Sequence, residues 1–198
     1  MSELGYVIII SGPSGVGKGT LIAKLCERFP RLKLAVSATT RLPRDGEVDG
    51  CEYHFLTLDD FNARIDRGEF VEWCTVHGNL YGTLRQEIDK TVLAGDNVLL
   101  EIDVQGAKKV VPQFNYVVRI FIAPPSDTAL LERLRHRNTE SEEALARRLE
   151  AASRELQEQK DYDYVVINRD IETAFQELVT ILKRLKNKEI NDGSKRKS

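Results

Sequence analysis

The stretch Gly12-Pro13-Ser14-Gly15-Val16-Gly17-Lys18 decides the fold of this chain. It matches the phosphate-binding pattern G-x-x-x-x-G-K, and it stands between a continuous apolar run, Tyr6–Ile10, and a helical pattern over Thr20–Phe29. The glycines let backbone amides turn toward phosphate oxygens, the helix N-terminus adds partial positive charge, and Lys18 can reach the β and γ phosphates. The stretch therefore predicts a strand, a nucleotide-binding loop and a helix in succession.

The residues just after the loop depart from its common form, in which Ser or Thr directly follows the lysine. Here Gly19 follows Lys18 and Thr20 comes one position later, which leaves open whether Thr20 holds magnesium as the usual hydroxyl does. A phosphate loop indicates a nucleotide but no particular reaction. A GTPase would add an Asn-Lys-x-Asp element, and the nearest match, Asn187-Lys188-Glu189-Ile190, lacks the aspartate. The sequence therefore disfavours a GTPase.

Strand and helix signals alternate along most of the remaining chain. Short apolar runs predict four more strands, at Leu34–Ser37, Asn97–Asp103, Val117–Ala123 and Tyr164–Asn168. Helical patterns follow most of them, at Gln105–Val111, Asp127–Arg137, Glu142–Gln159 and Ile171–Lys186. Five buried strands interleaved with helices predict an α/β fold, with a five-stranded parallel sheet flanked by helices.

Two segments interrupt this rhythm, and a third ends it. Residues 40–83 contain strand-like runs among turns rich in Gly, Asp and Pro, and we expect them to form a small inserted module. A short polar, charged stretch, Asn138–Glu143, suits a mobile lid over residues 138–159. The polar, basic end of the chain predicts a frayed tail at 188–198. The core then comprises residues 1–39, 84–137 and 160–187.

Composition limits the partners of the chain. Its 198 residues carry 29 basic and 31 acidic side chains, a formal net charge of -2, so we expect no nucleic acid as a partner. The sequence has no signal-peptide pattern and no apolar run near the ~20 residues of a membrane span, which predicts a cytoplasmic protein without membrane contact. Cys26, Cys51 and Cys74 form no CxxC pair and are expected to be reduced thiols. The sequence leaves the oligomeric state open.

A longer set of motifs resembles the guanylate kinase family. The segment Ser37–Gly50 (SATTRLPRDGEVDG), with Tyr53 after it, is similar to the acceptor-binding segment of that family. Similar motifs continue at matching spacings: Glu72-Trp73, Gly78–Thr83 (GNLYGT), Glu101–Ala107 (EIDVQGA) and Asn168. The resemblance covers Tyr6 to about Leu185. It implies a P-loop nucleoside monophosphate kinase fold, and transfer of the γ-phosphoryl group of ATP to GMP in purine nucleotide metabolism.

The resemblance also implies which residues bind GMP. They are Arg41, Arg44, Tyr53 and Tyr81 at the phosphate, and Ser37, Glu72, Thr83 and Asp103 at the base. Guanidinium groups fork onto phosphate oxygens. An acceptor-only carboxylate can receive the N1–H and N2–H groups of guanine together. Adenine has a lone pair at N1 instead, so the same carboxylate would repel adenine.

A second set of residues is implied for ATP and for catalysis. The ATP-binding residues are Gly12, Pro13, Ser14, Gly15, Val16, Gly17, Lys18, Gly19, Thr20, Arg133, Arg137 and Asn168. The catalytic residues are Lys18, Arg41, Arg137 and Arg148, and Glu101 is a candidate to help hold magnesium, directly or through water. The second pKa of a phosphate monoester is near ~6, so the attacking oxygen of GMP is largely deprotonated at neutral pH. No general base is therefore required.

Other interpretations stay open at this stage. Arg41 and Arg44 could be turn residues on a solvated loop, and the period of two along a strand could point Glu72 at solvent. The acceptor could be another nucleoside monophosphate. The chain could also be a non-catalytic guanylate-kinase-like module that binds protein partners, although such a module is expected to have a damaged phosphate loop or to lack the arginines.

Overall fold

Five strands form the parallel sheet that the sequence predicts. The computed structural model describes residues 5–76, 78–137 and 142–195, without the side chains of residues 136, 137, 142, 144 and 186–195. The strand order is β2-β7-β1-β8-β9. The strands are β1 (Val7–Ser11), β2 (Leu32–Leu34), β7 (Asn97–Glu101), β8 (Val117–Ala123) and β9 (Tyr164–Ile167). Helices flank this sheet, which confirms the predicted α/β fold.

The two strands before and after the first helix differ in burial. Every residue of β1 is buried, as expected of a strand in a sheet that is covered on both faces. β2 begins two residues before the expected Leu34, because Leu32 is the residue that turns inward: it is 4% exposed, and Leu34 is 44% exposed. The predicted strand, Leu34–Ser37, was therefore placed too late in the chain, because it was based on the apolar residues after Leu34.

The chain divides into two compact units, and the division falls inside β1 and again inside β8. The first unit contains residues 10–31 and the chain from 119 on. Its helices are α1 (Lys18–Arg28), α5 (Asp127–Arg137), α6 (Glu142–Gln157), the short η2 (Glu158–Asp161) and α7 (Ile171–Lys195). α7 runs past the expected end at Lys186, so the segment that the sequence marks as a tail is helical up to Lys195.

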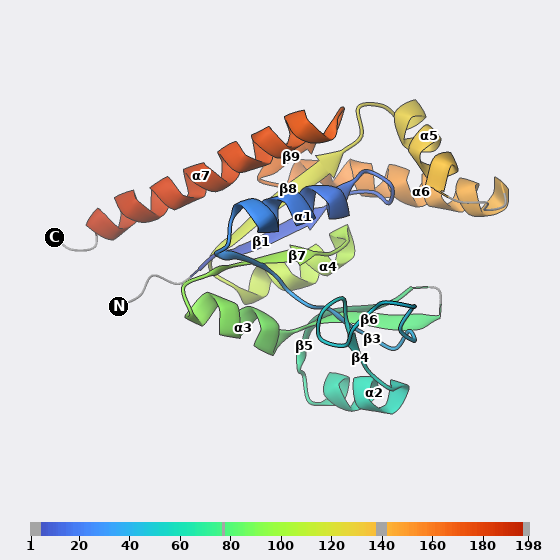
Figure 1. The fold of residues 1–198 in the computed structure, drawn as a ribbon, viewed down its shortest axis with the longest axis horizontal. Coiled ribbons are helices and arrows are strands. Elements are labelled where there is room, and N and C mark those ends of the chain that lie inside the picture. Colours follow the sequence, from blue (N-terminus) through green and yellow to red (C-terminus); the bar gives the residue numbers. More distant parts are fainter. Residues whose placement is uncertain (1–4, 77, 138–141, 196–198) are drawn as a thin grey trace. The chain divides into compact units, whose positions relative to one another are not determined.

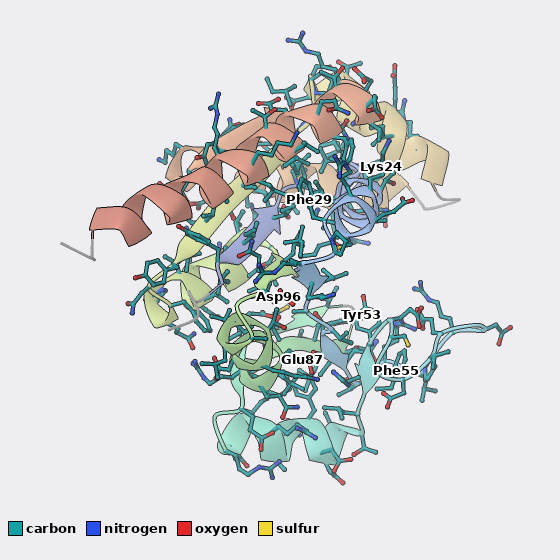
Figure 2. The ribbon with its side chains drawn as sticks, turned by 60° about the vertical axis from the view of Figure 1, so that its left-hand side comes forward. Lys24, Phe29, Tyr53, Phe55, Glu87 and Asp96 are labelled. Atoms are coloured by element: carbon teal, nitrogen blue, oxygen red, sulfur yellow. The ribbon has the colours of Figure 1, made fainter. Side chains whose placement is uncertain are left out.

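α1 and α7 lie side by side in the first unit (Figure 1). Lys24 of α1, labelled in Figure 2, pairs with Glu172 of α7 at 2.7 Å. The same ammonium group lies 4.9 Å from the ring centroid of Phe175. These contacts tie the helix that follows the phosphate loop to the last helix of the chain.

The second unit contains residues 32–118 and the chain up to residue 9. Its smaller sheet has the order β4-β3-β6-β5. The strands are β3 (Ala38–Thr39), β4 (His54–Phe55), β5 (Phe70–Val76) and β6 (Asn79–Leu84), and the helices are α2 (Leu58–Asp66), α3 (Arg85–Leu93), α4 (Val104–Val110) and the short η1 (Val111–Gln113). Phe61 of α2 stacks on Phe70 of β5, with ring centroids 4.3 Å apart. Most of this small sheet falls within residues 40–83, the expected module.

Two further observations concern the chain as a whole. Cys26, Cys51 and Cys74 are free cysteines. Across the described residues, no helix combines the length and the apolar character needed to cross a membrane.

Candidate functional site

The loop between β1 and α1 makes a close approach that requires glycine at its start. Gly12 has a φ of 145°, and a Cβ on this residue would lie 2.2 Å from the carbonyl oxygen of Ile122. α1 then begins at Lys18 with no side chain capping it and no acidic residue in its first turn. The free amides of a helix N-terminus attract anions, so this loop has the chemistry of a phosphate site.

Two cations lie against this loop. Lys18 Nζ donates to the carbonyl oxygens of Gly12, at 2.5 Å, and Pro13, at 3.1 Å. Arg148 of α6 donates from Nη2 to Ser14 Oγ at 2.7 Å. The structure therefore brings Arg148, an expected catalytic residue, to the loop that the sequence predicts to bind ATP.

Asn168 supports the loop from the end of β9. Its side chain is 1% exposed, and its Nδ2 donates to the carbonyl oxygen of Val16 at 2.7 Å. Arg133 of α5 donates to the carbonyl oxygens of Asn168, at 2.9 Å, and Arg169, at 3.2 Å. Asn168 Oδ1 is buried and has no hydrogen-bond partner among the described residues.

Two sequence predictions concern residues that the structure describes only in part or not at all. Arg137 is the last residue of α5, and its side chain lies outside the described residues. Residues 138–141, the start of the expected lid, lie outside them as well. The rest of that segment includes α6, which carries Arg148.

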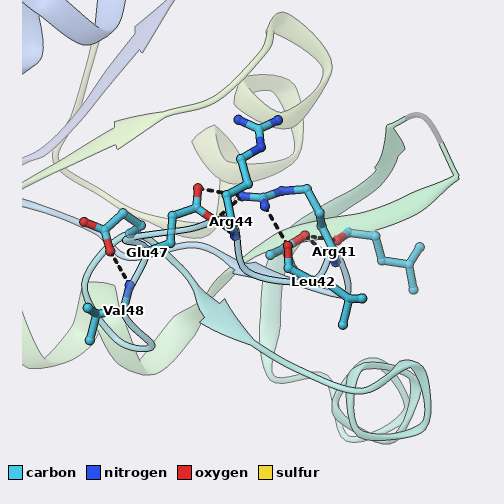
Figure 3. A network of polar contacts seen from close by, with 8 residues as sticks. Arg41, Leu42, Arg44, Glu47 and Val48 are labelled. Carbon is cyan, nitrogen blue, oxygen red and sulfur yellow. Dashed lines mark hydrogen bonds and ion pairs between the residues drawn. The ribbon is translucent and has the colours of Figure 1, made fainter.

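In the second unit, Glu47 connects the two arginines expected at the acceptor phosphate (Figure 3). Both carboxylate oxygens of Glu47 lie 2.9 Å from Arg41 Nη2, and the two side chains are only 16% and 17% exposed. The backbone N–H of Arg44 donates to Glu47 Oε2 at 2.8 Å. The guanidinium group of Arg44 extends away from this pair in Figure 3. Glu47 had no predicted role, although an acid shortly after two arginines in a turn is a signal for such a pair.

Aromatic rings complete the surroundings of Arg41. Its guanidinium carbon lies 5.4 Å from the ring centroid of Tyr53 and 5.7 Å from that of Phe55, two rings labelled in Figure 2. The Tyr81 ring lies 5.9 Å from the Tyr53 ring. The hydrogen bond to Glu47 raises the pKa of Arg41, and the pKa of Glu47 is lowered in return. Burial raises the pKa of Tyr53, so its hydroxyl stays a hydrogen-bond donor.

Glu72 is a buried acid in the second unit. Its side chain is 7% exposed, and Thr83 Oγ1 donates to Glu72 Oε1 at 2.7 Å. β5 and β6 are antiparallel, and their register shifts between Phe70 and Glu72, which marks a β-bulge. Because a bulge breaks the alternation of side chains, Val71 and Glu72 are both buried. The possibility that Glu72 points at solvent is thereby excluded.

The surroundings of Glu72 oppose its charge only in part. Burial raises the pKa of this carboxyl group, as does Asp103, whereas the hydrogen bond from Thr83 and the charge of Lys109 lower it. A Cβ on Gly106 would lie 3.2 Å from Glu72 Oε2, so a glycine at this position leaves room beside the carboxylate. Gly106 belongs to the motif Glu101–Ala107, but no role was predicted for this glycine.

Three other predicted residues lie near the ends of strands in this unit. Asp103 is the N-cap of α4, and its Oδ1 accepts the N–H of Gly106 at 2.7 Å. Ser37 is half-buried before β3, and its carbonyl oxygen accepts the N–H of His54 at 2.9 Å. Glu101 is the exposed last residue of β7. The second unit therefore holds an arginine–tyrosine cluster and a buried carboxylate with a hydroxyl beside it.

Comparisons with known proteins agree with one another. A family model described as guanylate kinase matches residues 5–185. Guanylate kinase of a Synechocystis species is 48% identical over 181 residues, which are 91% of this chain and 95% of that protein. Guanylate kinase of Desulfitobacterium hafniense is 45% identical over 178 residues, 90% of this chain and 89% of that protein. The crystal structure of guanylate kinase from Anaplasma phagocytophilum is similar with a TM-score of 0.74 and 35% identity, covering 92% of this chain and 87% of that one.

Proposed function

The chain belongs to the guanylate kinase family, and on that basis we propose that it transfers the γ-phosphoryl group of ATP to GMP, giving ADP and GDP. As a member of this family it is a nucleoside monophosphate kinase, an ATP:GMP phosphotransferase. The observation that carries the choice of acceptor is the buried carboxylate of Glu72, hydrogen-bonded by Thr83.

Glu72 reads the base of the acceptor. An ionised carboxylate has only acceptor sites, and Thr83 uses one of them on Oε1. The remaining sites suit the adjacent N1–H and N2–H donors of guanine, whereas the N1 lone pair of adenine would be repelled. Burial strengthens both the attraction and the repulsion, because the local dielectric constant is low. Ser37 and Asp103 are the other residues that we assign to the base.

Arg41 and Arg44 bind the phosphate of GMP, with Tyr53 and Tyr81 as hydroxyl donors. The contacts of Arg41 with Glu47 and with the Tyr53 ring support this role, because they hold the guanidinium group in one place before the ligand arrives. A cation that is already oriented needs no rearrangement when charge develops during transfer.

The loop from Gly12 to Thr20 binds the phosphates of ATP. Phosphate oxygens replace the two backbone carbonyls that hold Lys18 Nζ in the free protein. Arg133, Arg137 and Arg148 add positive charge, and the contact of Arg148 with Ser14 supports its part in this site. Asn168 holds the backbone of the loop through Val16, and we assign it to the neighbourhood of the adenine.

Transfer brings two anions together, so the protein supplies countercharge and alignment. A phosphate oxygen of GMP attacks the γ-phosphorus of ATP, the bond from that phosphorus to the bridging oxygen breaks, and ADP leaves. The oxygen of GMP is largely deprotonated at neutral pH because its second pKa is near ~6. The catalytic residues that we assign, Lys18, Arg41, Arg137 and Arg148, are accordingly all cations.

Magnesium fits this site as an ion carried mainly by ATP. Magnesium in phosphoryl-transfer enzymes keeps several waters and binds one or two carboxylates besides the substrate phosphates. Within the described ranges, no group of three His, Cys, Asp or Glu side chains could hold a metal without substrate. The exposed carboxylate of Glu101 would hold the ion, directly or through water. When bound, magnesium neutralises the β and γ oxygens of ATP.

We take the cytoplasm as the compartment of this enzyme, and purine nucleotide metabolism as its context, with ATP and GMP as its small-molecule partners.

Two other functions have less support. A kinase for a different nucleotide has no evident use for a buried carboxylate opposite Thr83. A non-catalytic interaction module has no need of Lys18 and Arg148 at an intact phosphate loop.

The variant Glu72→Gln tests the proposal. Its amide keeps the shape of the side chain, but its NH2 group would face one of the two guanine N–H donors, and two donors cannot form a hydrogen bond. The expected loss for GMP is roughly 2 to 4 kcal/mol, or about 30- to 1000-fold in kcat/KM. IMP lacks the 2-amino group, so its disadvantage relative to GMP should shrink. The measurement is kcat/KM for GMP, IMP and AMP, with folding checked by thermal melting.

Glu69→Gln is the matched control, because this nearby acid pairs with Arg64 and Arg67 instead. It is expected to keep the wild-type preference for GMP. An unchanged preference for GMP over IMP and AMP in a folded Glu72→Gln protein would show that Glu72 does not read the base.

A further inference from the structure

The strand that carries Glu72 has one side without a neighbouring strand. The order β4-β3-β6-β5 puts β5 at the edge of the smaller sheet. The bulge between Phe70 and Glu72 also falls in this strand. Edge strands leave backbone groups unpaired, and a bulge disrupts the ladder further. The segment that turns Glu72 inward is therefore fixed by backbone pairing on one side only, and the bulge interrupts that pairing.

Two side chains bind the carbonyl groups on either side of Glu72. Gln113 Nε2 donates to the carbonyl oxygen of Val71 at 2.7 Å. Lys109 Nζ donates to the carbonyl oxygen of Trp73 at 2.9 Å, and it lies 5.8 Å from the centroid of the Trp73 ring. Both donors come from α4 and the η1 turn that follows it. They take the place of a neighbouring strand at the residues next to Glu72.

The Gln113 side chain is itself held in one orientation. Its Nε2 also donates to the carbonyl oxygen of Lys109 at 2.6 Å, and its Oε1 accepts a hydrogen bond from Arg85 Nη2. The backbone N–H of Arg85 in turn donates to the carbonyl oxygen of Glu69 at 2.8 Å, just before β5 begins. With a donor on its oxygen and acceptors on its nitrogen, the amide has no reason to flip.

We propose that Lys109 and Gln113 are positioning residues for the base reader: they fix the bulged edge of β5 and so aim the Glu72 carboxylate at the acceptor base. This inference rests on the proposed role of Glu72. Neither residue touches the base, and both side chains are exposed. Their effect is on the geometry of Glu72 and therefore on the preference for guanine.

Lys109 has a second effect that Gln113 lacks, because it is charged. The charged groups that act on the Glu72 carboxylate are Asp103 at the start of α4 and Lys109 within α4. The titratable thiol of Cys74 lies on the same strand, and the charge of Glu72 raises the pKa of that thiol. Lys109 lowers the pKa of Glu72, and Asp103 raises it. Removal of the ammonium group raises that pKa further, so protonation of Glu72 begins at higher pH.

The experiment compares Lys109→Met and Gln113→Leu, which remove the hydrogen bonds at similar side-chain length. Both are expected to reduce the preference for GMP over IMP by roughly 10-fold, less than the ~100-fold that a misplacement of 1 Å can cost. The change should appear in KM for GMP, with KM for ATP unchanged. Lys109→Arg keeps a charged donor and is expected to restore the wild-type preference. Lys108→Met, a change of the exposed neighbour on α4, is the control.

The pH profile separates the two residues. In Lys109→Met the acid limb of kcat/KM for GMP should move to higher pH, whereas in Gln113→Leu it should stay in place.

An unchanged GMP preference in folded Lys109→Met and Gln113→Leu proteins overturns the inference, as does an equal loss for GMP and IMP. Glu72→Gln measured alongside tells the two failures apart. If that variant loses its preference and the other two keep theirs, only the positioning role is wrong; if it keeps its preference, the base-reading role is wrong.

Discussion

The Glu72 carboxylate lies where the physical chemistry of burial works against it. Its burial raises its pKa, and the hydrogen bonds from Thr83 and the charge of Lys109 offset this only in part. If stability alone determined the residue at this position, an apolar or amide side chain would be favoured. A locally unfavourable charge is expected where a ligand has to be recognised by it.

Glu72→Gln is therefore expected to stabilise the ligand-free protein at neutral pH while it weakens GMP recognition. The folded pKa of Glu72 lies above its ordinary value of 4.5. Between these two pKa values the native state binds more protons than the unfolded state, so stability falls as pH rises through that window. Above the window the full penalty is present, and its removal by about 1 kcal/mol would raise Tm by ~2–4 °C.

Thermal melting of both proteins at neutral pH and at about pH 4, near the ordinary pKa of a glutamate, measures this effect. The stabilisation should be present at neutral pH and nearly absent in acid. A lower Tm for Glu72→Gln at neutral pH would mean that the carboxylate stabilises the fold, contrary to the direction of its pKa shift.

Strands and helices whose apolar residues form a run or a helical period were predictable from the sequence, short ones such as β9 and α4 included. β1, β8 and α5 lie close to their expected positions. α3 was missed because a nine-residue helix with Ile88 as its one buried residue has too few apolar positions to show a helical period. β6 has no strand pattern in the sequence, because its Gly and Asn residues are poor strand formers.

The candidate site shows the same limit. Residue types and spacing indicated the phosphate loop, and the resemblance to the guanylate kinase family implied the roles of the paired arginines and Glu72. They could not indicate the bulge in β5, because a bulge is a matter of register between two strands and leaves no mark in the order of residue types. The pairing of Arg41 with Glu47 likewise depends on how a turn folds.

Helix α4 allows the contribution of one N-cap carboxylate to the stability of the fold to be tested. Asp103 is its N-cap, through the hydrogen bond from the N–H of Gly106. Asp103→Ala removes this cap and should lower the free energy of unfolding by about 0.5–2 kcal/mol, whereas Asp103→Asn keeps a good cap and should change it little. Urea denaturation measures both. If both variants lose the same stability, the charge of Asp103 matters and its capping bond does not.

At the level of the complete chain, the two units divide the candidate residues by substrate, except that Glu101, the candidate for magnesium, lies in the second unit. The first unit carries the loop from Gly12, with Arg133, Arg148 and Asn168, and the second carries the residues assigned to GMP. Each set is built from contacts inside its own unit. Variants in one set are therefore expected to leave binding at the other set intact.

Lys18→Ala tests this separation. Turnover should fall by ~10²–10³, as when one donor to a developing charge is removed, while the Kd for GMP in the absence of ATP stays at its wild-type value. Isothermal titration calorimetry gives the Kd, and a coupled assay of ADP formation gives the turnover. Lys24→Ala, which removes a lysine of α1 that pairs with Glu172 instead, is the control. Near-normal turnover, or loss of GMP binding together with turnover, would contradict the division.

The pair formed by Arg41 and Glu47 also bears on competition from small anions in the cell. Glu47 at 2.9 Å offsets much of the charge of Arg41, so a passing inorganic phosphate or sulfate gains too little there to make up for the loss of its own hydration. A nucleotide brings a base as well as a phosphate, and so draws on contacts that no inorganic ion can make. A solution rich in inorganic phosphate should therefore occupy this arginine poorly and leave it to the nucleotide.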